Sequence, residues 1–171
     1  MDNFVGNTMT DLLPDISDEH GDKVRWIPQQ WLDYGGNPAF HGRVETLRCY
    51  EDNTKVREIL SGPGEGRVLV IDGHGNLNKA LLGDQLAELA VKNGWNGIVV
   101  NGAVRDVSAL STMDLGVKAM GACPIKTEKR GAGDRDVSLR IAGMLVSPGD
   151  YLYADLNGIM LSEHPVDFGA E

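Results

Sequence analysis

Hydrophobic and polar residues follow a regular pattern from residue 42 onward, and this pattern predicts alternating strands and helices. Val44, Thr46 and residues 47–50 have the character of a strand, and residues 54–60 that of a short helix. Residues 67–71 form an apolar, β-branched run of the kind found in buried strands. The middle of the chain is therefore expected to contain both types of element.

A β-α-β unit is predicted immediately after that run. Leu82, Leu86, Leu89 and Ala90 recur at helical spacing, and Gly94 is placed to end the helix as its C′ residue. The apolar residues 98–100 predict a second buried strand. The two strands should be parallel neighbours joined by a right-handed crossover.

The two ends of the chain differ from this centre. Residues 1–40 are expected to be an irregular segment packed on the domain, with a short helix at Thr10–Leu13 stopped by Pro14 and a loop over residues 34–38. The carboxyl half is mostly β. Its predicted strands span residues 117–122, 137–141, 144–146, 151–154 and 159–161. The fold class is thus an α/β single compact domain, residues 1–171, with a central β-α-β unit and a mostly β carboxyl half.

Composition narrows the function classes. The 171 residues include 16 Lys+Arg and 25 Asp+Glu, and the net charge of −9 argues against general binding to nucleic acid or to an anionic membrane. The two cysteines, Cys49 and Cys123, form no zinc or redox motif and read as buried thiols. No signal peptide or membrane span is evident, so a cytoplasmic location is expected.

Three segments are predicted to meet at one edge of the β-α-β unit, because both strands end there and the helix begins there. They are residues 72–75 (DGHG), 83–86 (GDQL) and 101–106 (NGAVRD). Together they offer free backbone N–H groups, one guanidinium and several carboxylates. Such a set suits a small anion together with a hard divalent cation.

Each of these residues also has a structural explanation. Asp84 is equally suited to cap the helix that follows it, and Asp106 to cap a helix over residues 107–112. Arg105 has neighbouring carboxylates with which it could pair. Gly73 and Gly75 begin a G-x-G-x-x-G pattern that fails at Asn78. The four histidines form no metal-ligand cluster, and no Schiff-base lysine stands out among Lys79, Lys126 and Lys129.

Several segments together resemble the RraA-like family, which includes regulators of ribonuclease activity and the class II 4-hydroxy-4-methyl-2-oxoglutarate aldolases. The resemblance covers nearly the whole chain. It rests on residues 40–53 (FHGRVETLRCYEDN), 66–73 (GRVLVIDG), 83–84 (GD), 97–106 (GIVVNGAVRD), 129–133 (KRGAG), 148–150 (PGD) and 155–159 (DLNGI). It implies a fold of the swivelling phosphohistidine-domain type with β/β/α layers, assembled as a homotrimer with clefts between subunits.

The resemblance also implies roles for individual residues. The aldolase motif of the family is a glycine, a spacer, an Arg-Asp pair and, after two further residues, an acid. Gly83 and Arg105-Asp106 match, whereas the final acid is replaced by Ala109. By position, Gly83, Asp84, Gln85 and Leu86 would bind substrate oxygens. Arg105 would bind the 2-oxo acid and, with Asp106, be catalytic, while Asp106 would hold Mg²⁺ or Mn²⁺ directly and Asp84 would do so through water. Lys129 matches a basic residue of the family.

These residue types suit the chemistry of the aldolases. Cleavage of 4-hydroxy-4-methyl-2-oxoglutarate leaves a pyruvate enolate that a metal ion and Arg105 can stabilise, and decarboxylation of oxaloacetate leaves the same enolate. A water molecule, rather than a histidine, would take the proton of the substrate hydroxyl. The alternative is a protein-binding regulator that inhibits ribonuclease E by charge complementarity. A demethylmenaquinone methyltransferase, an older label in the family, is the weaker alternative because the glycine motif is broken.

Overall fold

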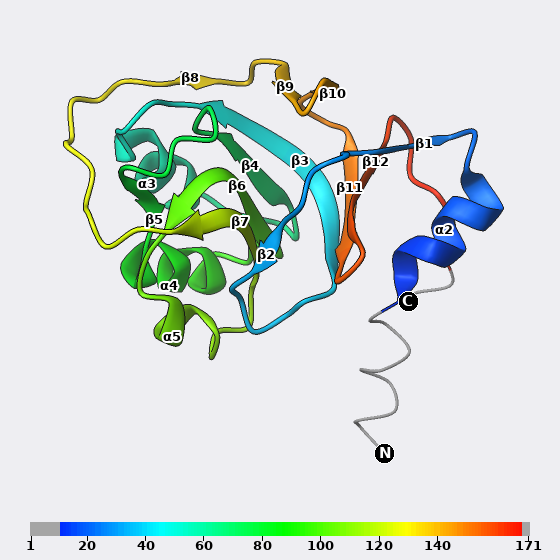
Figure 1. Ribbon diagram of the computed structural model, residues 1–171, viewed down its shortest axis with the longest axis horizontal. Helices are drawn as coiled ribbons and strands as arrows, with labels where there is room; N and C mark the ends of the chain where they lie inside the picture. Colours follow the sequence, from blue (N-terminus) through cyan, green and yellow to red (C-terminus); the bar gives the residue numbers. More distant parts are fainter. Residues whose placement is uncertain (1–10, 169–171) are drawn as a thin grey trace.

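Four parallel strands form the centre of the protein, whose structure is a computed structural model describing residues 11–168 (Figure 1). They are β3 (Phe40–Arg48), β4 (Val68–Asp72), β6 (Gly97–Val104) and β7 (Gly116–Ala122). Every residue of β4 and all but one of β6 are buried. Strands covered on both faces read as continuous apolar runs, which is why the sequence located them.

The predicted β-α-β unit is confirmed, because β4 and β6 are parallel neighbours and α4 (Asp84–Lys92) lies in the crossover between them. Gly94 has a φ of 82° and ends the helical segment as expected. The prediction that Leu82 belongs to the helix is wrong. Leu82 belongs to β5 (Ala80–Leu82), a short, fully buried strand that pairs with β6. A single leucine just before a helix fits both the helical period and the strand period. Only the pairing of Leu82 with β6 shows that it belongs to a strand.

The remaining strands extend this sheet on both sides. The order of the main path is β1-β12-β11-β3-β4-β6-β7-β2, with β5 beside β6 and β8 beside β3, while β9 and β10 form a separate hairpin. Their bounds are β1 Val24–Trp26, β2 Leu32–Asp33, β8 Asp134–Arg135, β9 Leu139–Ile141, β10 Met144–Val146, β11 Tyr151–Asp155 and β12 Gly158–Ser162. The mostly β carboxyl half is thereby confirmed.

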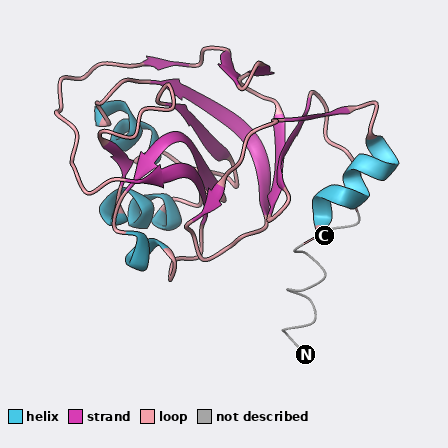
Figure 2. Ribbon diagram, viewed as in Figure 1, coloured by secondary structure: helices cyan, strands magenta, loops and turns pink. Residues whose placement is uncertain are grey.

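The elements lie in β/β/α layers, as expected. The helices α3 (Thr54–Leu60), α4 and α5 (Val107–Leu110) cover one face of the parallel strands (Figure 2). The other face packs against β11, β12 and the β9–β10 hairpin through a second apolar cluster. The fold is therefore a single α/β domain with a mixed sheet and few helices. Among residues 11–168, no helix is both long and apolar enough to cross a membrane.

The amino-terminal segment contains more structure than the sequence predicts. A helix, α2, runs over Leu12–His20 and packs on β11 and β12, whereas we expected Pro14 to stop a helix at Leu13; Thr10 lies outside the described residues. Proline is tolerated here because the first turn of a helix needs no intrahelical partner for its N–H groups. The segment also supplies β1 and β2 to the edges of the sheet.

An ion pair between a buried lysine and a more exposed aspartate fixes β2 on its edge of the sheet. The side chain of Lys118 in β7 is 1 % exposed, and its Nζ lies 2.7 Å from Oδ1 of Asp33 in β2. An ammonium group without a partner is very costly at that depth. Asp33 therefore holds the short strand in place.

Phe40 occupies a space that two glycines leave open in the parallel sheet. A Cβ added to Gly97 or to Gly116 would overlap its ring. These two residues are paired in the β6–β7 register, so the ring lies across both strands. The absence of two side chains thus lets the Phe40 ring pack against β6 and β7.

Replacing Gly97 or Gly116 with alanine is expected to lower the free energy of unfolding by about 1–3 kcal/mol, because the added methyl group overpacks the core against Phe40. Urea denaturation measures the change. Gly62→Ala is the matched control, since its Cβ would meet only the Ile59 carbonyl oxygen at 3.5 Å; its effect should stay below about 0.5 kcal/mol. Equal stability of all three variants would contradict this packing.

Asp52 anchors the long segment between β7 and β8 to the start of α3. Its carboxylate is fully buried and accepts hydrogen bonds from the backbone and hydroxyl of Thr54, at 3.0 and 2.7 Å, and from the backbone N–H groups of Arg130 and Ala132, at 2.8 and 3.0 Å. Burial raises the pKa of Asp52, but these hydrogen bonds outweigh burial and hold the pKa well below its ordinary value. The segment is therefore tied to an ionised carboxylate.

Asp52→Asn is expected to lower the free energy of unfolding by at least about 2 kcal/mol at pH 7, because an amide cannot accept all four hydrogen bonds. The folded-state pKa lies below the unfolded one, so the contribution of the carboxylate is complete above about pH 4 and is lost as the pH falls further. The gap in stability between wild type and variant should thus shrink on acidification. Asp18→Asn is the control, because Asp18 is an exposed residue of α2. A gap that is the same at pH 7 and pH 3 would contradict this account.

Candidate active site

Two of the three segments predicted to meet at the edge of the β-α-β unit do meet, in a pocket of about 220 Å³. Residues 83–86 come from the start of α4, and Arg105 and Asp106 follow β6. The pocket is also bordered by α3 and by the long segment that follows β7, the yellow trace in Figure 1. Its lining residues are Asn53, Thr54, Arg57, Ala80, Gly83, Asp84, Gln85, Leu86, Arg105, Asp106, Lys126, Thr127 and Lys129.

Gly83 brings the two predicted segments into contact. Its backbone is extended, with φ −134°, and it is the N-cap residue of α4. A Cβ at this position would lie 2.7 Å from Oδ2 of Asp106 and 3.5 Å from Nε of Arg105. A side chain here would push away the Asp106 carboxylate and crowd the Arg105 guanidinium.

Asp106 caps a helix, but not the one that the sequence suggests. The alternative explanation from the sequence is a cap for the helix that follows it, and Asp106 is the N-cap residue of α5 by position, but its side chain makes no hydrogen bond to α5. Its Oδ2 instead accepts a hydrogen bond of 3.0 Å from the backbone N–H of Asp84 at the start of α4. Asp84 is in turn the first helical residue and not the N-cap. Asp106 therefore joins the end of β6 to the start of α4.

The backbone of Asp106 is in a conformation that non-glycine residues rarely adopt, with φ 58° and ψ 41°. Strain of this kind persists where the surrounding structure imposes it, and it is frequent at functional sites. Asp106 comes soon after the end of β6. The residue before it, Arg105, is still paired with β5, because its N–H donates a hydrogen bond of 2.9 Å to the Leu82 carbonyl. The left-handed turn directs the carboxylate of Asp106 back toward Gly83.

Arg105 remains available to a ligand. Its Nε lies 4.0 Å from Oδ2 of Asp106, and the two side chains are 40 % and 38 % exposed. A pair that is this long and this exposed contributes little to stability. The guanidinium therefore presents its donors to the pocket, where it can bind a carboxylate through two parallel hydrogen bonds.

The opposite wall of the pocket is not predicted by the sequence patterns. Asn53 is its centre: its amide donates to the Leu81 carbonyl at 3.4 Å, and its Oδ1 accepts from Thr127 Oγ1 at 2.7 Å and from Lys129 Nζ at 3.2 Å. Only the family resemblance points to Lys129. Arg57 lies one turn further along α3, with its N–H bonded to the Asn53 carbonyl. No motif links these residues, because they come from segments more than seventy positions apart.

The charge of the pocket is opposite in sign to that of the chain. Four basic side chains line it, those of Arg57, Arg105, Lys126 and Lys129, against the two carboxylates of Asp84 and Asp106. The whole chain has a net charge of −9. The pocket is therefore a local positive region that favours anionic ligands.

The donors in the pocket suit a loosely held hard cation and not a preformed metal cage. Within residues 11–168, no group of three or more His, Cys, Asp or Glu side chains is positioned to bind a metal ion. Asp84 and Asp106 nevertheless lie side by side at one end of the pocket. Mg²⁺ keeps several waters and is held by one or two carboxylates together with substrate oxygens, so this pair fits it.

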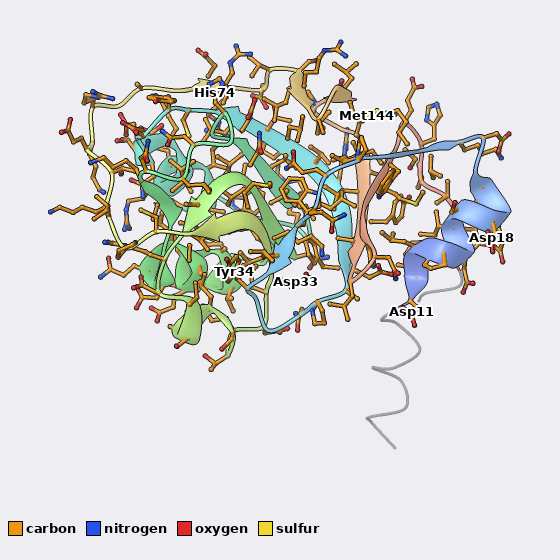
Figure 3. All side chains as sticks on the ribbon, in the orientation of Figure 1. Asp11, Asp18, Asp33, Tyr34, His74 and Met144 are labelled. Carbon is orange, nitrogen blue, oxygen red and sulfur yellow. The ribbon has the colours of Figure 1, made fainter. Side chains whose placement is uncertain are left out.

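The glycine-bearing turn after β4 does not line the pocket, and the prediction that it joins the site is wrong. Oδ1 of Asp72 accepts hydrogen bonds from the His74 N–H and from Nδ2 of Asn101, both at 2.9 Å. The N–H of Gly75 donates to the Asn101 carbonyl. These bonds fold the turn onto the middle of β6, and His74 lies on the outside of the molecule (Figure 3).

Other groups considered from the sequence also lie outside the site. Neither the histidines nor Ala109, which replaces the last acid of the family motif, is among the lining residues. Both cysteines are buried, as expected, and burial, with smaller contributions from Asp52 and Asp72, raises the pKa of Cys49 to about 12. That thiol is therefore protonated at neutral pH.

Comparisons with known proteins relate this architecture to a defined group. The RraA-like family model, described as Aldolase/RraA, matches residues 13–161. A protein of Photobacterium profundum, provisionally named a 4-hydroxy-4-methyl-2-oxoglutarate aldolase, is 60 % identical over 159 residues, which are 93 % of this chain and 98 % of that protein. A protein of the same provisional name from Vibrio cholerae is 54 % identical, over 93 % of this chain and 99 % of its own length.

A solved structure agrees with the family match. The RNA-processing inhibitor RraA from Thermus thermophilis superposes with a TM-score of 0.87 at 43 % identity, covering 90 % of this chain and 93 % of that one. Its fold is that of the single mixed-sheet domain described above. Sequence and structure together show that this chain belongs to the RraA-like family.

Proposed function

We propose that this protein is a divalent-metal-dependent aldolase that cleaves 4-hydroxy-4-methyl-2-oxoglutarate to pyruvate and decarboxylates oxaloacetate at the same site. The observation that carries the proposal is the meeting of Gly83, Asp84, Arg105 and Asp106 at one end of a positively charged pocket. The provisional aldolase name of the 60 % identical relative supports it. Gln85 and Leu86 complete the surface that would face substrate oxygens.

The residues of the pocket suit the chemistry of a 2-oxo acid. Arg105 would bind the carboxylate beside the keto group and stabilise negative charge on the keto oxygen. When the C3–C4 bond breaks, its electron pair forms the enolate of pyruvate, the C4 hydroxyl loses its proton, and the C4 fragment leaves as a second pyruvate. In oxaloacetate the same bond releases carbon dioxide and leaves the same enolate. One arrangement of side chains therefore serves both reactions.

The carboxylates at this end of the pocket have a different task. Asp106 directly, and Asp84 through water, would hold Mg²⁺ or Mn²⁺, which supplies Lewis-acid stabilisation of the keto oxygen when bound. The backbone N–H of Asp84 keeps Oδ2 of Asp106 in a fixed position, which leaves Oδ1 free for a ligand. Asp106 is thereby oriented before any ligand enters.

Asp106→Ala is expected to lower pyruvate release from both substrates by at least about 100-fold, because it removes the proposed metal-binding carboxylate. EDTA should abolish release by the wild type, and added Mg²⁺ or Mn²⁺ should restore it. Pyruvate is measured with a coupled dehydrogenase, and circular dichroism checks that the variant is folded. Wild-type activity that persists in EDTA would refute metal dependence. No release from either substrate, with either metal, would refute the aldolase function.

Gly83→Ala tests the geometry more directly, since it removes no charged group. The added Cβ would displace the Asp106 carboxylate, so kcat/KM is expected to fall by at least about tenfold while the protein stays folded. Steady-state kinetics and urea denaturation measure the two quantities. Gly62→Ala, outside the pocket, should keep the activity of the wild type. Full activity of Gly83→Ala would show that the close approach of Gly83 to Asp106 is unimportant.

A second candidate function is regulation of ribonuclease E by direct binding. The 43 % identity to a protein named as an RNA-processing inhibitor favours it. A chain with a net charge of −9 would suit basic segments of such a partner. Inhibition of purified ribonuclease E, in the absence of metal-dependent pyruvate release, would support this alternative in place of the aldolase.

Assembly and the older methyltransferase label are separate questions. We propose a homotrimer, as the family resemblance implies, which sedimentation equilibrium would test.

A solved structure from Geobacillus kaustophilus, named a methyltransferase that acts on 2-dimethylmenaquinone, is 38 % identical, with a TM-score of 0.89 over 90 % of this chain and 96 % of that one. In this chain the glycine-bearing turn, which has part of the pattern of a methyl-donor loop, is folded onto Asn101, so the aldolase is the better-supported function.

A further inference from the structure

Two basic side chains of the pocket have no task in the chemistry described above. Arg57 and Lys126 line the pocket, yet within residues 11–168 neither side chain has a hydrogen-bond or ion-pair partner. The other two basic groups differ from them. Arg105 lies 4.0 Å from Asp106, and Lys129 donates to Asn53 at 3.2 Å.

The two residues come from different elements and are brought to the same wall. Lys126 lies in the segment after β7, where it forms an isolated parallel bridge with Ala80 of β5. Arg57 lies in α3, one turn after Asn53. Asn53 connects these parts, because its side chain bonds both β5, at the Leu81 carbonyl, and Thr127, the residue next to Lys126. Arg57 and Lys126 thus line the same pocket although 69 positions separate them.

The pocket lining therefore contains two chemically different groups of side chains. Around Gly83, one guanidinium is matched by the carboxylates of Asp84 and Asp106. Around Asn53, the lining side chains include cations and no carboxylate. A ligand with a single negative group near a keto oxygen would satisfy only the first group. A ligand that also bears a second negative group would satisfy both.

We propose that Arg57 and Lys126 form a second anion subsite that binds the distal carboxylate of a 2-oxo dicarboxylate. The inference rests on the proposed function for the orientation of the substrate, with its 2-oxo end at Arg105. It assigns the two residues that would select these dicarboxylates over 2-oxo acids with a single carboxylate. Arg57 and Lys126 determine specificity in this scheme and take no part in bond cleavage, so their loss raises KM more than it lowers kcat.

The kinetic test compares two substrates that undergo the same cleavage. 4-Hydroxy-4-methyl-2-oxoglutarate has the distal carboxylate, and 4-hydroxy-2-oxopentanoate lacks it. Arg57→Gln and Lys126→Gln should each lower kcat/KM for the first substrate by at least about threefold, and the double variant by about tenfold or more, mainly through KM. Values for the second substrate should stay within about twofold. Lys92→Gln, at the far end of α4, is the matched control and should change neither.

A binding measurement keeps this test separate from the proposed function. Isothermal titration with 2-oxoglutarate and 2-oxopentanoate, in the presence of Mg²⁺, compares five-carbon 2-oxo acids with and without a distal carboxylate. The wild type should bind 2-oxoglutarate more tightly, and the double variant should lose that preference. This result is expected even if the protein cleaves no substrate. Equal affinity of the wild type for the two acids, or an unchanged preference in the double variant, would overturn the subsite.

Discussion

The absence of a side chain at Gly83 is the constraint on which the pocket depends. It lets the carboxylate of Asp106 approach the first turn of α4 and accept the N–H of Asp84, so that the end of β6 and the start of α4 become one unit. The strained backbone of Asp106 is part of the same arrangement, since an ordinary conformation would not return its side chain toward Gly83. Arg105 then presents its guanidinium to the pocket as a consequence of its neighbour's position.

The opposite wall is held by a different kind of interaction. Asp52 is buried and ionised, and it gathers the N–H groups of Arg130 and Ala132 onto the start of α3. Asn53, the next residue, faces the pocket and bonds Thr127 and Lys129. Two adjacent residues therefore perform separate tasks, one anchoring the segment between β7 and β8 and the other arranging its side chains. A long connection that would otherwise be mobile becomes a fixed part of the site.

The two walls explain how an acidic protein can bind anions. Its net charge describes the surface as a whole, whereas a ligand responds to the groups within a Debye length of it. In the pocket, four basic side chains outnumber two carboxylates, and the carboxylates lie together where a cation would be useful. The same chain can thus present an acidic exterior and a positive cavity, which is why net charge excluded general nucleic-acid binding but said nothing about the sign of the ligand.

The sequence by itself determined the β-α-β unit, the strands of the carboxyl half and one wall of the pocket. Periodicity is local, and parallel strands must end at the same edge, so Gly83 and Arg105-Asp106 could be placed together. Only the tertiary structure decided that Asp106 caps α4, that Asn101 holds the glycine-bearing turn away, and that Arg57 and Lys126 face one cavity. These outcomes depend on hydrogen bonds between residues 22 to 80 positions apart, for which a single sequence carries no periodic signal.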